Sequence, residues 1–173
     1  FPGGVMTGLI PYNNDLAILG GDNGLYQWSG DPAAGAVFDE ITSAAGTGMA
    51  FGRAWCKDPL GQVYFFGRTG GVYRLRLNTP AQIMTDRLTT LGVERMIGVD
   101  LDAYVPSLMW DNYLQGVHVF LTPYNLSATP YWYFFDAGTE GWFKCRFATD
   151  VMHPLAVTPL DGDSSNDRKL GFG

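Results

Sequence analysis

Three aspartates stand at similar places along the chain, and pairs of carboxylates are the groups that hydrolyse glycosidic bonds. Asp15, Asp58 and Asp111 each lie near a turn between two strand-like segments. In equivalent folded units, the three carboxylates would lie around one rim, where a sugar could bind. Each also neighbours an Asn or Pro, and such pairs are typical of tight turns. We expect the turn role and no enzymatic activity, with no catalytic residues and no cofactor.

A second acidic cluster suggests a metal site. Asp161, Asp163 and Asp167 have the spacing with which an EF-hand-like calcium loop begins. The sixth position, where that loop has Gly, is Asn166, and the twelfth, where it has a bidentate Glu, is Phe172. The loop is therefore a weak calcium candidate, and the alternative is a solvated hairpin.

The segment 136–143 is Asp-Ala-Gly-Thr-Glu-Gly-Trp-Phe and resembles the turns of kelch-type and Asp-box propeller blades. In such a turn, Asp136 accepts backbone N–H bonds. Trp142 is expected to pack between neighbouring sheets. We expect neither Asp136 nor Glu140 to be catalytic.

The histidines and cysteines lack partners at the sequence spacings of metal or catalytic motifs. His118 and His153 have neither metal-ligand nor triad spacing and are expected to be structural. Cys56 and Cys145 are too far apart in sequence for a short metal motif. We expect two buried free thiols, with a disulfide as the alternative.

Three arginines gather in one predicted hairpin: Arg68, Arg74 and Arg76. Strand alternation places Arg74 and Arg76 on the same face. That face is expected to be solvated, or else to form ion pairs with a neighbouring subunit.

The composition narrows the possible folds. The 173 residues are 46% hydrophobic, 16% charged and 14% aromatic, with 23 glycines. This content supports a folded core and favours short strands joined by turns over a helical bundle. No apolar run is long enough for a membrane helix. The net charge of −6 and the pI of about 4.6 exclude a general basic surface for nucleic acid.

A repeat of about 50 residues organises these strands. Apolar segments at 15–21, 62–67 and 116–121 are followed by aromatic segments at 25–28, 72–75 and 131–135. Further strands are expected before each pair, at 8–12, 50–55 and 105–110, and after it, at 37–41, 82–84 and 142–147. Residues 155–158 and 169–172 would begin a fourth unit, and residues 87–97 a short helical connector. The dipeptides Asn23-Gly24 and Gly70-Gly71 predict hairpin turns with positive φ.

This pattern predicts an all-β fold, specifically a β-propeller segment spanning residues 1–173. Its four-stranded antiparallel blades would cover about 8–42, 50–86 and 104–148, with part of a fourth at 152–173. A β-sandwich is the alternative, although it does not predict the repeat. The chain begins at Phe1 without Met and ends in a strand-like segment, so we expect a fragment of a larger propeller.

Three stretches resemble virion proteins of tailed bacteriophages: residues 9–36, which include a Gly-Asp-Pro turn, residues 54–75 and residues 131–142. Among these, the chain resembles tail nozzle proteins of short-tailed phages. It implies a structural protein in the virion tail, present in the host cytoplasm during assembly. The implied partners are further copies of the chain in a ring, and other tail or adaptor proteins. Viral DNA would pass through the ring's exit channel without sequence-specific contact, which the acidic net charge would favour.

The alternative function is a propeller domain that binds or hydrolyses carbohydrate. A sugar site requires aromatic and carboxylate side chains that converge in one pocket, whereas a virion module requires apolar side chains spread over contact faces.

Overall fold

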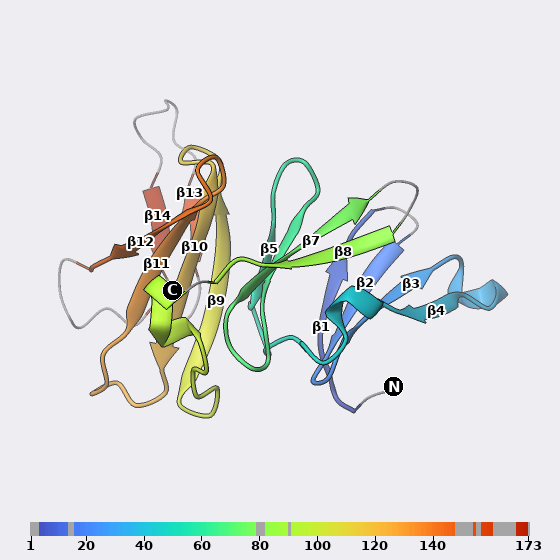
Figure 1. Cartoon of the computed structure of the whole chain (residues 1–173), viewed down its shortest axis with the longest axis horizontal. Coiled ribbons are helices and arrows are strands. Elements are labelled where there is room, and N and C mark those ends of the chain that lie inside the picture. The colour runs from blue at the N-terminus through green and yellow to red at the C-terminus, as the bar shows by residue number, and fades with distance from the viewer. Residues whose placement is uncertain are drawn as a thin grey trace.

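The computed structural model describes residues 4–13, 16–78, 82–89, 91–147, 154, 157–160 and 169–172. It is all-β, as predicted, and helix is limited to short 3-10 turns: η1 (Pro32–Ala34), η2 (Thr42–Ala44) and η3 (Leu91–Met96). Three antiparallel four-stranded sheets follow one another along the chain, and each is an open meander (Figure 1).

The strands lie in sequence order within each sheet. Sheet 1 contains β1 (Met6–Pro11), β2 (Leu16–Gly21), β3 (Leu25–Ser29) and β4 (Val37–Glu40). Sheet 2 contains β5 (Trp55–Lys57), β6 (Val63–Phe66), β7 (Val72–Asn78) and β8 (Gln82–Arg87). Sheet 3 contains β9 (Tyr104–Asp111), β10 (Gly116–Pro123), β11 (Tyr131–Asp136) and β12 (Gly141–Cys145). A fourth, two-stranded sheet pairs β13 (Val157–Leu160) with β14 (Lys169–Phe172).

The sheets stack because the middle strands are apolar on both faces. In β6, Val63 and Phe65 point toward sheet 1 and join a cluster with Ile18. The alternate residues, Tyr64 and Phe66, join the cluster shared with sheet 3. All four β6 side chains are buried, so sheet 2 is the central layer between sheets 1 and 3.

The connection from sheet 1 to sheet 2 differs from the prediction. Residues 50–54 do not form a strand, since β5 begins at Trp55. Instead Met49 donates its N–H to the carbonyl of Gly21, and Ala50 donates to Phe66. The Met49 side chain fills the space over Gly8 and Gly20, where an added Cβ would lie 2.2 and 2.4 Å from its Cε. The connection is therefore packed between the two sheets.

The two predicted glycine turns have different conformations. Gly70 and Gly71 have φ of 89° and 88°, as predicted. The φ of Gly24 lies outside the left-handed region, so that part of the prediction was wrong. β2 and β3 are joined by a three-residue loop, closed by a 2.8 Å hydrogen bond from the Gly21 N–H to the Gly24 carbonyl. This loop does not need the two left-handed residues of a two-residue turn.

Candidate functional site

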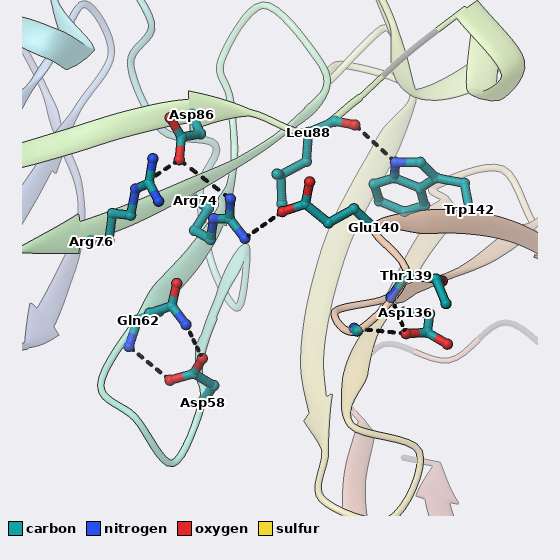
Figure 2. Close-up of polar contacts among 11 residues, drawn as sticks. Asp58, Gln62, Arg74, Arg76, Asp86, Leu88, Asp136, Thr139, Glu140 and Trp142 are labelled. Carbon is teal, nitrogen blue, oxygen red and sulfur yellow. Dashed lines mark hydrogen bonds and ion pairs between the residues drawn. The ribbon is translucent and has the colours of Figure 1, made fainter.

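Asp58 lies in the turn between β5 and β6, and Asp111 is the last residue of β9, at the start of the turn to β10. Asp58 is 5% exposed and accepts hydrogen bonds from the Gln62 backbone N–H (2.8 Å) and side-chain Nε2 (2.9 Å) (Figure 2). An open groove of about 370 Å³ between the two turns is lined by Asp58 and by Asn112, the neighbour of Asp111. Of the three aspartates, Asp58 lines this groove, Asp111 does not, and Asp15 lies outside the described residues.

Asp111 is held from both sides of its carboxylate. Oδ1 accepts the N–H groups of Tyr113 (2.7 Å) and Leu114 (2.9 Å), and Oδ2 lies 3.2 Å from Nε2 of His118. Burial alone would raise the pKa of Asp111, but the hydrogen bonds from Leu114, His118 and Tyr113 outweigh it and lower the pKa. A carboxylate with these bonds is a turn-stabilising group.

His118 connects Asp111 to an aromatic cluster. Trp132 Nε1 donates to His118 Nδ1 at 3.0 Å, so the neutral ring carries its proton on Nε2 and donates it to Asp111. The His118 side chain is 4% exposed, and its ring lies 4.9 Å from that of Phe134 and 6.1 Å from that of Phe120. Burial lowers the pKa of His118, and Asp111 opposes that shift only partly. His118 thus links the Asp111 turn to the buried aromatic cluster, a partner that its sequence spacing did not predict, whereas His153 lies outside the described residues.

The predicted turn at Asp136 is confirmed. Its Oδ1 accepts the N–H groups of Gly138 (2.8 Å) and Thr139 (3.0 Å). The β9–β10 and β11–β12 turns share one pattern: an aspartate, three intervening residues, a residue with positive φ and a glycine. The positive-φ residues are Gln115 (53°) and Glu140 (52°). Sequence reasoning missed this pattern, although the spacing Asp-x-x-x-(Gln/Glu)-Gly could have revealed it.

A polar seam joins sheets 2 and 3, and it corrects the prediction for the arginines (Figure 2). Arg74 on β7 reaches Glu140 of sheet 3 at 3.1 Å and Asp86 of β8 at 3.4 Å, and its side chain is 13% exposed. Arg76 pairs with Asp86 at 3.0 Å. Arg74 therefore has its ion pairs within the chain, because the stacking of sheets 2 and 3 brings Glu140 within reach, whereas the Arg76 side chain is 52% exposed. Arg68 lies apart, with its guanidinium 5.4 Å from the Phe51 ring centroid.

Trp142 packs between the sheets, as predicted. Its Nε1 donates to the Leu88 carbonyl at 2.9 Å, just after the end of β8 (Figure 2). Its ring lies 5.0 Å from that of Phe135 in the shared core. The hydrogen bond fixes β12 against the chain that leaves sheet 2.

The two cysteines are free, so the disulfide alternative was wrong. Cys56 is buried and Cys145 half-buried. Burial, followed by the nearby Asp58 charge, raises the pKa of Cys56, which keeps its thiol protonated and unreactive. Within the described residues, no group of three His, Cys, Asp or Glu side chains could hold a metal ion. The predicted calcium ligands Asp161, Asp163 and Asp167 lie outside that part of the chain.

A pocket of about 210 Å³ lies where sheets 2 and 3 meet at the start of β9. Its wall includes Phe51, Arg68, Leu101, Tyr104, Pro106 and Tyr124. Sequence reasoning missed this pocket because its residues come from four connections and from β9, which lie far apart in the chain.

The described residues thus form hydrogen-bonded turns, an ion-paired seam between sheets 2 and 3, and a pocket lined by aromatic side chains. No helix in the described part of the chain is long and apolar enough to span a membrane. Comparisons with protein-family models, with curated proteins and with solved structures found no match to this chain.

Proposed function

We propose that this chain is a non-catalytic structural module of a tailed-bacteriophage particle, in which its sheets are blades of a β-propeller. The observation that carries the proposal is the regular face-to-face stacking of four-stranded meanders, each buried against the next. In the virion, such a module would form part of a tail nozzle around the DNA exit channel.

The first strands of successive sheets lie next to one another, as the inner strands of a propeller do. Lys57 of β5 donates to the Tyr12 carbonyl, just after β1, at 2.8 Å. Leu108 of β9 donates its N–H to the Arg53 carbonyl, just before β5, at 2.9 Å. A channel would be lined by β1, β5 and β9.

The absence of catalysis is proposed because the best-placed carboxylates are already occupied. Asp58 is buried and bonded twice by Gln62, and Asp111 is held by two turn amides and His118. Neither carboxylate is free to act as an acid or nucleophile on a glycosidic bond. Incubation of the purified protein with bacterial polysaccharides should release no sugar. Release that is lost in Asp58→Asn or Asp111→Asn would contradict this part of the proposal.

A ring of copies is proposed because sheet 1 has an apolar outer face. Leu9, Leu19 and Tyr26 are cross-strand neighbours there, and Tyr26 stacks on Phe38 at 5.1 Å. Leu9 is 50% exposed, whereas Leu19 (7%) and Tyr26 (8%) are already covered within the chain, so the exposed apolar surface there is centred on Leu9. Exposed apolar faces of this kind favour association.

Sedimentation velocity of the purified chain at several concentrations tests this association. We expect oligomers whose proportion rises with concentration, and Leu9→Lys should shift them toward the 18.9 kDa monomer. Leu60→Lys is the matched control, because Leu60 is 86% exposed on the β5–β6 turn and lies away from that face. A monomer at every concentration would contradict the ring.

The phage assignment has its own test, because oligomers form in many kinds of protein. The reading frame that encodes this chain should lie beside portal and tail genes, and antibodies against the chain should label the tails of the corresponding particles. A reading frame surrounded by metabolic genes would contradict the assignment.

A further inference from the structure

The pocket at the start of β9 has a preformed aromatic rim. Phe51 is 47% exposed and Tyr124 is 66% exposed, and both belong to its wall. The backbone beside each is fixed: Ala50 donates to the Phe66 carbonyl at 2.9 Å, and Tyr124 to the Ala103 carbonyl at 3.0 Å. Ordered, exposed aromatic rings offer flat surfaces on which another ring can stack at little entropic cost.

Guanidinium groups accompany these rings. Arg68 lies over Phe51, and Arg95 lies 5.7 Å from the Tyr131 ring, which neighbours Tyr104. Neither arginine forms an ion pair with another residue in the described part of the chain. An arginine without a carboxylate partner can donate two parallel hydrogen bonds to a carboxylate from outside the molecule.

The charge around the pocket is mixed, and this limits the ligand. Leu101 of the wall stands between Asp100 and Asp102, both exposed, and the chain carries a net charge of −6. Nucleic acid is bound through several basic contacts along its backbone, whereas the wall of this pocket holds one arginine, Arg68. A ligand with a single carboxylate per ring needs only Arg68.

We propose that this pocket binds a carboxylate-bearing sugar of an acidic polysaccharide. The sugar ring would stack on Tyr124, and its carboxylate would accept hydrogen bonds from Arg68, which lies over the Phe51 ring. The pocket volume of about 210 Å³ suits one ring rather than a folded partner. This binding develops the carbohydrate alternative without its hydrolytic part, and it does not depend on the proposed assembly in a virion.

Isothermal titration calorimetry with a linear oligomer of galacturonic acid tests the proposal. We expect saturable binding that weakens about tenfold in Tyr124→Ala, the loss of about one stacking contact. Arg68→Gln should weaken it similarly, because the carboxylate loses its charged partner. Tyr113→Ala is the matched control, because Tyr113 is 62% exposed in the turn after β9, at the other end of that strand from the pocket. This variant should bind the oligomer as tightly as the unmodified protein does.

Two further ligands test whether the carboxylate and the sugar ring are both required for binding. A neutral maltose oligomer should bind at least about tenfold more weakly, because it lacks the carboxylate. A single-stranded oligodeoxynucleotide should not compete. Any of four results would overturn the proposal. The first three are failure of the galacturonate oligomer to bind, equally tight binding of the neutral oligomer, and tighter binding of the oligonucleotide. The fourth is a loss of binding in Tyr113→Ala equal to that in Tyr124→Ala. Sedimentation of the same samples reports the oligomeric state, so failure to bind the sugar is distinguished from failure of the proposed assembly.

Discussion

The chain Trp132–His118–Asp111 makes stability depend on pH in a predictable direction. The Trp132 N–H points at His118 Nδ1, so a second ring proton on Nδ1 would face another donor. Burial adds to this by lowering the pKa of His118 below its ordinary value. The unfolded chain therefore binds a proton on His118 at a higher pH than the folded chain does.

The sign and size follow from proton linkage. Above the unfolded pKa of about 6.5, both states are neutral at His118 and the stabilisation is complete. As the pH falls below about 6.5, the free energy of unfolding drops by at most about 1.4 kcal/mol per pH unit, until the folded pKa is reached. Between pH 7.5 and pH 5.5 the loss is therefore at most about 1.4 kcal/mol.

Urea unfolding at pH 7.5, 6.5 and 5.5 measures this loss, with His118→Gln as the reference. Gln cannot titrate but offers both a donor and an acceptor, so its curve should be flatter. His153 is present in both proteins, so its contribution cancels. Trp132→Phe removes the opposing N–H, so His118 should titrate at a higher pH and the pH dependence should shrink. The reasoning is refuted if the three proteins lose stability in parallel, or if NMR titration places the pKa of His118 at or above 6.5.

Substitutions at three further positions test the turns and the contact between sheets 2 and 3, each by urea unfolding at pH 7.5. Asp58→Ala should cost about 1–2 kcal/mol, because it leaves the half-buried Gln62 N–H without its acceptor, whereas Asp58→Asn should cost less; equal losses would contradict this role. Gln115→Gly should be neutral or slightly stabilising, while Gln115→Val should lose more than about 1 kcal/mol, because φ is 53° there; the reverse order would refute the strain argument. Trp142→Phe should cost about 1 kcal/mol through loss of the 2.9 Å bond to Leu88, and no loss would mean that water replaces it fully.

The local elements of this protein follow from its sequence. Alternating and continuous apolar segments predicted the strands of the three sheets, except that β5 begins at Trp55 rather than at residue 50, and the repeat predicted that they would form equivalent meanders. The Asp136 turn was predictable because an aspartate carboxylate accepts N–H groups two and three residues ahead. These features depend on residues close together in the chain, so local physical chemistry determines them.

The contacts between sheets were decided by the tertiary structure. Nothing in the sequence pairs Arg74 with Glu140. The two residues are neighbours because β6 is apolar on both faces, so that a sheet packs on each face. The same stacking brings Phe51, Arg68 and Tyr124 to one pocket from three separate segments. A side chain's partners across a sheet stack depend on the distance and angle between sheets, which no local pattern specifies.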